Sequence, residues 1–325
     1  MPDAPNRWLI VGSGAIAARH VECVSQLLGN VSFARLSSSG GPPASWAIDR
    51  MVENVFYDWD SALAWAPDAC IVANAASGHI EALEKLLNFG VPVLVEKPLA
   101  SGLSGTERVV DLARRSGHPV LVGYCLRFHP AVKSVMRLLD SGVLGSTIQC
   151  TAVVGQHIAD WRDRAAEESV SLSSQLGGGA LLELSHEIDL SIALMGSVRQ
   201  TTGYTVTPNG YEVDIATSLS LLHETGVTSI SLNMLQRPAQ RSVTVVTTEG
   251  SVSADLIAGE VTAALTDGQV TVEKNLGPDE MYLDQMRHFL DCITGAARPV
   301  SDLSSAIAVL ECVEIVRGKA TVLEQ

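Results

Sequence analysis

The stretch WLIVGSGAIA, at residues 8–17, decides the fold, because a short apolar run there leads directly into the pattern G-x-G-x-x-A. This pattern is the dinucleotide-binding form of a strand–turn–helix unit. Gly12 permits the tight turn, Gly14 lets the backbone approach a pyrophosphate, and Ala17 leaves room for close packing of the helix on the strand. The start of the helix would attract the phosphate charge. We therefore expect this turn to bind a dinucleotide.

Apolar runs alternate with helical patterns over the first third of the chain. The runs that we interpret as strands are 8–11, 31–36, 70–73, 91–95 and 120–122, and the helical patterns are 15–28, 78–89 and 106–116. This alternation is typical of a doubly wound parallel sheet with helices on both faces. The fold class is therefore α/β, with a dinucleotide-binding Rossmann domain at residues 1–123.

The pattern changes after residue 123. Helices are predicted at 130–140, from about 179, at 281–294 and at 303–318, and apolar or alternating runs at 148–155, 212–222, 228–235, 242–247 and 269–272. The alternation indicates an open, mainly antiparallel sheet with one exposed face. We expect residues 124–325 to form an α+β domain for substrate binding and oligomerisation. The apolar alternation at 215–221 and 243–246 needs a cover, and another subunit supplies it if helices do not, so we expect a homodimer or homotetramer through this sheet.

Composition narrows the function classes. The 325 residues, 46% of them hydrophobic, suit about two domains. A net charge of −14 without a basic stripe argues against nucleic acid and anionic membranes as partners. No apolar run reaches the roughly 18 residues of a membrane span, and the six cysteines lack metal-ligand spacing. We expect a cytoplasmic protein with a small-molecule substrate.

The end of the second predicted strand bears on the choice of cofactor. An NAD-specific Rossmann domain usually carries a carboxylate there to hold the ribose 2′-hydroxyl. The chain instead has ARLSSS at 34–39, in which Arg35, Ser37 and Ser38 would accept a 2′-phosphate, so NADP is favoured over NAD. The alternative is that Arg35 points to solvent and both cofactors bind. The full set of predicted cofactor-binding residues is Gly12, Ser13, Gly14, Ala15, Ile16, Arg35, Ser37, Ser38, Ala73, Asn74, Ala75, Glu96 and Lys97.

Two further segments carry chemistry. Lys97, in Val95-Glu96-Lys97-Pro98, follows a wound strand and lies beyond the carboxyl edge of the sheet, where ligands of such folds bind. A lysine there can donate to a substrate oxygen. The glycines at 177–179 form a flexible turn before a predicted helix on which Glu183, His186 and Asp189 step by three residues and share one side.

These motifs together resemble the Gfo/Idh/MocA family of glucose-fructose oxidoreductase and inositol dehydrogenase, over essentially the whole chain. The resemblance rests on the Gly-rich turn with His20, on 73–79, on Glu96-Lys97-Pro98 and on the Gly-Gly-Gly helix with His186. It implies a Rossmann enzyme with an α/β substrate domain built on an open antiparallel sheet, acting on sugars, cyclitols or nucleotide sugars. It also implies that Lys97 and His186 are the catalytic pair.

The chain departs from the commoner family spacing Asp-x-x-x-His, because it has Glu183-x-x-His186. A subgroup with Asp-x-x-His-Glu-x-Asp, linked to surface-polysaccharide or sialic-acid-like sugar pathways, is similar at 122–130 and 155–162. In these stretches Tyr124, Arg127 and Trp161 are candidate substrate contacts. Arg127 would serve equally in a structural ion pair, and Trp161 would either stack on a sugar ring or anchor its loop.

The mechanism that we expect is reversible hydride transfer between nicotinamide C4 and a carbon bearing a secondary hydroxyl or carbonyl. His186 would move the hydroxyl proton and Lys97 would stabilise the same oxygen, the two converging from different domains. Glu183 or Asp189 would position the substrate or the histidine. A reductase of a non-sugar carbonyl or conjugated substrate, and a non-catalytic NADP-sensing regulator, are the alternatives.

Three features are kept outside the predicted site. His20 and His79 lie near the expected cofactor, but each is on a helix start or face, where a solvated histidine is the ordinary outcome. Glu183-x-x-His186 matches one element of a carboxylate-bridged metal site, which requires a second such element on another helix. The sequence has none, so we expect no metal.

Overall fold

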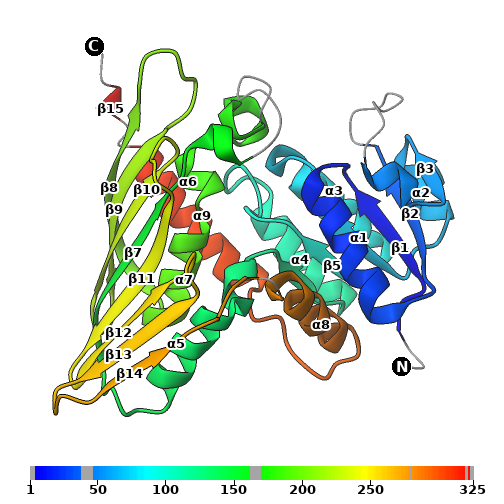
Figure 1. The fold of residues 1–325 in the computed structure, drawn as a ribbon. Helices are drawn as coiled ribbons and strands as arrows, with labels where there is room; N and C mark the ends of the chain where they lie inside the picture. Colours follow the sequence, from blue (N-terminus) through cyan, green and yellow to red (C-terminus); the bar gives the residue numbers. More distant parts are fainter. Residues whose placement is uncertain (1–3, 38–46, 162–169, 279, 319–320, 323–325) are drawn as a thin grey trace. The chain divides into compact units, whose positions relative to one another are not determined.

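The computed structural model describes all residues except 1–3, 38–46, 162–169, 279, 319–320 and 323–325 (Figure 1). The chain divides into two compact units: residues 1–124 with 282–307 form unit 1, and residues 125–281 with 308–325 form unit 2. The chain first passes from unit 1 to unit 2 after residue 124, one residue beyond the predicted domain boundary. The return of 282–307 to unit 1 departs from the single stretch 124–325 predicted for the second domain.

Unit 1 contains a parallel sheet with the strand order β3-β2-β1-β4-β5-β6. Its strands are β1 (Arg7–Val11), β2 (Ser32–Leu36), β3 (Asn54–Phe56), β4 (Ala69–Val72), β5 (Val93–Val95) and β6 (Val120–Val122). Its helices are α1 (Ala15–Leu28), α2 (Trp59–Ala64), α3 (His79–Phe89), α4 (Thr106–Ser116) and most of α8 (Met281–Ile293). The strand order reverses between β1 and β4, and ligands of doubly wound sheets bind at such a switch point.

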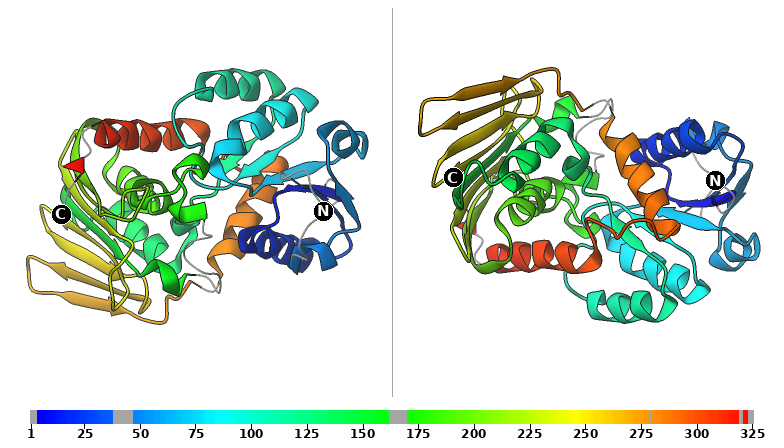
Figure 2. Two further views of the ribbon diagram at one scale, coloured as in Figure 1. Left: turned by 90° about the horizontal axis from the view of Figure 1, so that it is seen from above. Right: turned by 90° about the horizontal axis from the view of Figure 1, so that it is seen from below.

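Helix α8 explains the return of the chain to unit 1. Its buried side chains, including Met286 and Phe289, belong to the same apolar core as Trp8 of β1 and Val21 of α1. The rings of Trp8 and Phe289 meet edge to face with centroids 6.2 Å apart. Both views of Figure 2 show α8, in orange, beside α1, in blue. Because these contacts join residues far apart in the sequence, no local pattern predicts them. For this reason the sequence pattern placed α8 in the second domain.

Unit 2 is built on a mostly antiparallel sheet with the strand order β14-β13-β12-β11-β7-β10-β9-β8-β15. The strands are β7 (Thr147–Gly155), β8 (Val198–Thr207), β9 (Ala216–His223), β10 (Val227–Asn233), β11 (Gln240–Thr247), β12 (Gly250–Asp255), β13 (Glu260–Leu265), β14 (Val270–Glu273) and β15 (Thr321–Val322). The pairs β7–β10 and β8–β15 are parallel. The helices are α5 (Pro130–Asp140), α6 (Ala180–Glu183), α7 (His186–Met195) and the larger part of α9 (Leu303–Arg317).

Helices of unit 2 cover one face of this sheet, and in both views of Figure 2 they stand on the same side of it. The alternating apolar residues that were expected to need another subunit, among them Leu219, Leu221, Val243 and Val245, are buried. Helices α5, α6 and α7 pack against strands of the sheet, so the chain itself covers this face and the alternation gives no reason to expect another subunit there. No helix in the described part of the chain is long and apolar enough to cross a lipid bilayer.

Candidate active site

The Gly-rich turn of unit 1 packs tightly against the end of β4. Gly12 has φ +116°, and a Cβ built on it would lie 2.6 Å from the carbonyl carbon of Ala73. No side chain fits there. The Gly12 N–H donates to the Leu36 carbonyl at 3.2 Å, and the Ala73 N–H donates to the Val11 carbonyl at 2.8 Å. The turn is therefore fixed at the switch point between β1 and β4.

The start of α1 is suited to an anion. Gly14 is its N-cap, no side chain caps the helix, and its first turn contains no acidic residue. A Cβ built on Gly14 would meet no described atom within 4 Å, so the space in front of the helix start is open. The first N–H groups of a helix have no partner within the helix, and they attract phosphate. The residues of this turn, Ser13, Ala15 and Ile16 included, therefore fit the pyrophosphate of a dinucleotide.

The end of β2 was predicted to contact the cofactor ribose. Arg35 is only 1% exposed, so the alternative in which it points to solvent is wrong. Ser37 is buried and its N–H donates to the Phe56 carbonyl at 2.9 Å. Ser38 lies outside the described residues. The described residues at this strand end, 32–37, contain no carboxylate.

The end of β4 places Ala73, Asn74 and Ala75 at the same edge of the sheet as Gly12. The Asn74 carbonyl lies 3.0 Å from Nε2 of His79. The side-chain oxygen of Asn74 is buried without a partner among the described groups. A buried acceptor of this kind is costly unless a donor reaches it. This supports a ligand that brings a donor to this edge.

Lys97 differs from its neighbours in exposure. It is half-buried, whereas each of the other residues from 91 to 100 is buried. The preceding Glu96 continues the pairing beyond β5, because its N–H donates to the Val72 carbonyl at 2.8 Å. Lys97 is therefore the one residue of this stretch that reaches the surface, at the carboxyl edge of the parallel sheet.

The Gly-Gly-Gly turn of unit 2 is followed by two short helices, and the prediction of one continuous helix is wrong. Gly179 has φ +106°, and a Cβ there would collide with the Asp214 carboxylate. Asp214 holds the start of α6, since its Oδ2 accepts the Leu181 N–H at 2.8 Å. Helix α6 ends at Glu183, where the Ser185 hydroxyl donates to the Leu182 carbonyl. Helix α7 begins at His186, so Glu183 and His186 are not neighbours on one helix face.

The two predicted side chains at this junction are held differently. His186 is the first residue of α7 and is 8% exposed. Glu183 accepts a hydrogen bond from the hydroxyl of Ser171 at 2.9 Å. Ser171 is fully buried in the turn at Val170–Leu172 and was missed by the sequence analysis, because nothing local marks a serine there as a partner of Glu183.

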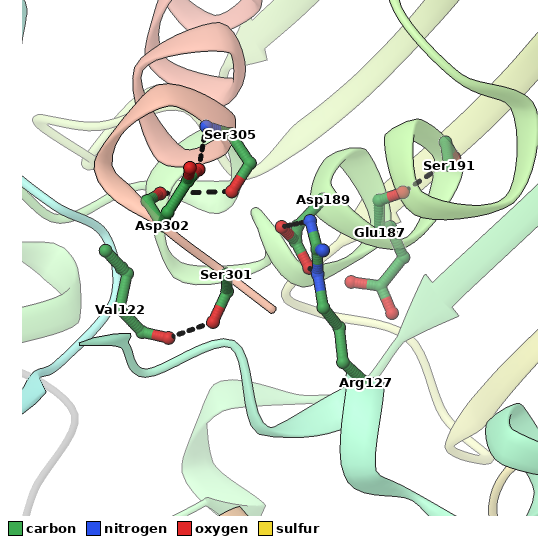
Figure 3. Close-up of polar contacts among 8 residues, drawn as sticks. All are labelled: Val122, Arg127, Glu187, Asp189, Ser191, Ser301, Asp302 and Ser305. Atoms are coloured by element: carbon green, nitrogen blue, oxygen red, sulfur yellow. Dashed lines mark hydrogen bonds and ion pairs between the residues drawn. The ribbon is translucent and has the colours of Figure 1, made fainter. Parts of the chain in front are cut away.

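Two buried carboxylates on α7 are each paired with an arginine. The Arg127 Nε and Nη2 donate to the two Asp189 oxygens at 2.8 and 2.7 Å (Figure 3), and Asp189 is fully buried. Burial raises the pKa of Asp189, while Arg127 opposes that rise. Glu187 accepts from Arg241 at 2.7 and 3.1 Å. The geometry therefore supports the structural alternative for Arg127, and it does not support Asp189 as a direct substrate ligand.

The remaining predicted substrate contacts are separate from this pair. Tyr124 is fully buried and is the last residue of the first segment of unit 1. Trp161 is half-buried, and its indole nitrogen is buried with no partner in the described part of the chain. The residue before it, Asp160, accepts two hydrogen bonds from Arg237, at 2.7 and 2.9 Å. That exposed ion pair ties the Trp161 turn to the segment between β10 and β11.

Comparisons with known proteins agree with this architecture. Residues 6–124 match the model of an oxidoreductase family with an NAD-binding Rossmann fold, and residues 132–253 match the GFO/IDH/MocA C-terminal domain. The D-xylose 1-dehydrogenase (NADP(+)) 2 of Haloferax volcanii is 21% identical over 320 residues, which cover 96% of either chain.

Two solved structures share the fold at low sequence identity. Levoglucosan dehydrogenase, in complex with NADH and levoglucosan, superposes with a TM-score of 0.86 at 16% identity and covers 96% of each chain. The WlbA dehydrogenase of Bordetella pertussis, in complex with NADH and UDP-GlcNAcA, gives a TM-score of 0.81 at 18% identity, with 98% of this chain and 96% of WlbA covered. With both of its domain models matched along the chain, the protein belongs to the GFO/IDH/MocA family of oxidoreductases.

Proposed function

We propose that the protein is an NAD(P)-dependent dehydrogenase that oxidises a secondary alcohol, or reduces the matching carbonyl, on a sugar, cyclitol or nucleotide sugar. The observation that carries the proposal is Lys97, the half-buried residue in an otherwise buried stretch at the carboxyl edge of the parallel sheet. The Gly-rich turn opens at the same edge. Likeness over the full length of a D-xylose dehydrogenase supports the sugar class.

In this proposal unit 1 holds the dinucleotide and unit 2 holds the substrate. The backbone N–H groups of residues 12–16 would hold the pyrophosphate, and Asn74 and Lys97 would contact the nicotinamide end of the cofactor. A bound nicotinamide supplies the hydride-transfer chemistry. His186 takes the hydroxyl proton in oxidation and returns it in reduction. The Lys97 ammonium donates to the same substrate oxygen and stabilises the charge on it, while Glu183, held by Ser171, orients the substrate.

NADP is the cofactor that we favour. The end of β2 offers no carboxylate among its described residues to hold a ribose 2′-hydroxyl, and it carries Arg35 and Ser37 instead. An arginine suits a phosphate because its fork of donors matches phosphate oxygens. The NADP specificity in the name of the Haloferax volcanii relative is in line with this choice.

The proposal is tested by turnover of a substrate panel with NAD+ and with NADP+. The panel contains D-xylose, levoglucosan, myo-inositol and a UDP-linked hexosamine, and the fastest substrate is used for the variants. Removal of a positioned acid–base group costs about 10²–10⁴-fold in rate, so we expect losses of that size for His186→Ala and Lys97→Ala. Cofactor affinity, measured by fluorescence titration, should stay within about threefold for His186→Ala.

The control is His157→Ala, which removes a half-buried histidine of unit 2 that has no part in the proposed chemistry. We expect it to retain turnover. Full activity of the His186→Ala or Lys97→Ala enzyme would contradict the proposed mechanism. Binding of NADP(H) without turnover of any carbonyl or alcohol would support the regulator instead.

The open face of the large sheet is the proposed contact between copies of this chain. Tyr204 is 69% exposed on it, and Leu222 and Val227, which pair across β9 and β10, are 42% and 45% exposed among serines and threonines. Apolar residues gathered on one exposed face often mark an interface. We expect a dimer or tetramer by light scattering at micromolar concentration. Tyr204→Lys should shift it toward the monomer, while the exposed Tyr57→Lys in unit 1 should not.

A further inference from the structure

Two histidines that the sequence analysis left out of the site contact the segment carrying Lys97. His20 on α1 and His79 at the start of α3 are 0% and 1% exposed, respectively. A histidine buried this completely needs partners for its ring nitrogens. One ring nitrogen of each contacts a residue next to Lys97 in the sequence, which is Glu96 for His20 and Pro98 for His79.

On the side of Glu96, the carboxylate is held from several directions. The His20 Nε2 donates to Glu96 Oε1 at 2.6 Å, and Glu96 Oε2 accepts the Lys97 N–H at 3.2 Å. A Cβ built on Gly123 would lie 2.9 Å from Glu96 Oε2, so the neighbouring strand end leaves no spare room. The ring of Tyr282 on α8 packs edge-on against His20, with centroids 6.2 Å apart. The carboxylate in turn fixes the backbone N–H of Lys97.

On the other side, His79 fixes the backbone that follows Lys97. Its Nδ1 lies 2.9 Å from the Pro98 carbonyl, and its Nε2 lies 3.0 Å from the Asn74 carbonyl. Burial lowers the pKa of His79, so the ring is neutral and donates through one nitrogen. His79 therefore joins the segment after β5 to the segment after β4. Both segments belong to the proposed cofactor site.

These contacts leave the Lys97 side chain as the part of the segment that reaches the surface. When the N–H of a residue and the carbonyl of the next residue are both held, the direction of its Cα–Cβ bond is set as well. We propose that His20, Glu96 and His79 are positioning residues that aim Lys97 at the substrate oxygen. The inference rests on the proposed catalytic role of Lys97. In this proposal buried histidines on α1 and α3 aim the lysine. Helix α1 also begins at the Gly-rich turn.

The test compares a donor with a non-donor of similar size at each histidine. In His20→Gln the amide nitrogen occupies roughly the place of Nε2, and in His79→Asn it occupies roughly the place of Nδ1, so each retains a donor. His20→Leu and His79→Leu retain the volume without the donor. A misplacement of about 1 Å costs up to about 100-fold in rate. We expect the leucine variants to lose about 10- to 100-fold in kcat with KM nearly unchanged, and the amide variants to recover most of the loss.

Each leucine variant is also made in the Lys97→Ala background. If the histidines act through Lys97, they have no further effect on kcat there, within about twofold, because the effects of coupled residues are not additive. Equal losses in both backgrounds, or equal losses for the amide and leucine variants, would overturn the inference. If Lys97→Ala alone keeps full turnover, it is the proposed function that fails.

A measurement without turnover guards against variants that fold poorly. Glu96→Leu keeps a side chain of similar volume and removes the acceptor that holds the Lys97 N–H. Amide hydrogen exchange of the segment 91–100 in the full-length protein should then accelerate at Lys97, while the rest of unit 1 keeps its protection. The matched control is His223→Leu, another buried histidine with two partners, at 2.9 Å each, on the large sheet of unit 2. It should lower stability without changing exchange at Lys97, and unchanged exchange in Glu96→Leu would contradict the proposal.

Discussion

Each unit buries an arginine, and the two arginines have different surroundings. Arg127 of unit 2 donates twice to the fully buried Asp189, so its counter-ion is a side chain fixed by the fold. Arg35 of unit 1 is 1% exposed on β2, at the strand end where an NAD-specific enzyme carries a carboxylate. A guanidinium keeps its charge in proteins. The first arginine is thus part of the scaffold, whereas we propose that the second serves a phosphate of the cofactor.

The comparison shows why the sequence did not distinguish an arginine with a structural role from one proposed to bind the cofactor. Both arginines were predicted as ligand contacts, because each lies near an expected binding edge. The pair with Asp189 is what identifies the structural role of Arg127. Asp189 is 62 residues from Arg127 in the sequence, and no local pattern links them. The available signal was two carboxylates, Glu187 and Asp189, on the otherwise apolar helix α7, which indicates that buried cations must meet them.

The largest effect is expected from Arg127→Leu. Removing one partner of a buried ion pair leaves an uncompensated charge and costs about 3–5 kcal/mol. The free energy of unfolding of unit 2 should fall by that amount in urea. Removing both charges, in Arg127→Leu with Asp189→Leu, should restore much of the stability, because the desolvation cost disappears together with the pair.

The matched control is Arg237→Leu, which breaks a pair with the same bidentate geometry, 2.7 and 2.9 Å, on the surface of unit 2. Arg237 and Asp160 are 57% and 45% exposed, so water replaces the lost partner. We expect no resolvable change in the unfolding midpoint. Equal destabilisation by Arg127→Leu and Arg237→Leu would mean that burial does not determine how much these ion pairs contribute to stability.

A smaller effect, on binding, is expected from Arg35→Gln. Hydrogen bonds to charged groups contribute about 1.5–3 kcal/mol, so the affinity for NADPH should fall about 10- to 100-fold, while that for NADH should change by less than about threefold. Fluorescence titration of both cofactors measures this difference. Arg114→Gln, at an exposed position on α4, is the control. Equal weakening of NADPH and NADH would assign Arg35 to the scaffold, together with Arg127.

Local signals determined what the sequence predicted well. The bounds of α1, α4 and α5 agree residue by residue, because apolar periodicity and terminal glycines such as Gly29 and Gly117 mark them. The Rossmann assignment, the fold class and the family are confirmed. The short, half-exposed strand β3 and the strands β8, β12 and β13 were not predicted, since their pairing partners rather than their own sequence define them.

Long-range packing determined what the sequence did not predict. The Ser185 hydroxyl helps to end α6 and so breaks the helix that spacing alone suggested. The return of α8 to unit 1 depends on contacts with Trp8, at the other end of the chain. His20 and His79 were assigned to solvated helix positions, yet both are buried by contacts across unit 1. The roles predicted for Lys97 and His186 stay predictions that the variants above test, and the role of Glu183 also stays a prediction.

The smallest effect concerns His129 of unit 2, which would carry a positive charge if it were protonated. Its Nδ1 accepts the Ala131 N–H at 3.1 Å and so caps the start of α5. Burial lowers the pKa of His129, the hydrogen bond to the Leu256 backbone opposes that change, and the positive charge of Arg241 adds to the lowering. Protonation of Nδ1 would also remove the acceptor that caps the helix. The arginine sites accept buried positive charge, whereas this site keeps its residue neutral.

The sign of the pH dependence follows from that lowered pKa. Below about pH 6.5 the unfolded chain binds a proton at His129 more readily than the folded chain does. The stability that His129 contributes is therefore present above that pH and is lost as the pH falls through the window below it.

His129→Asn keeps a capping acceptor without titrating. We expect the loss of unfolding free energy between pH 7.5 and 5.5 to shrink by about 1 kcal/mol or less in this variant. Part of the dependence should remain, because burial also lowers the pKa of His79 and His288. Urea unfolding at both pH values measures the difference, and His118→Asn, at an exposed position, corrects for the loss of a histidine as such. An unchanged slope in His129→Asn would show that unit 2 tolerates a protonated His129, and the contrast with its arginine site would not hold.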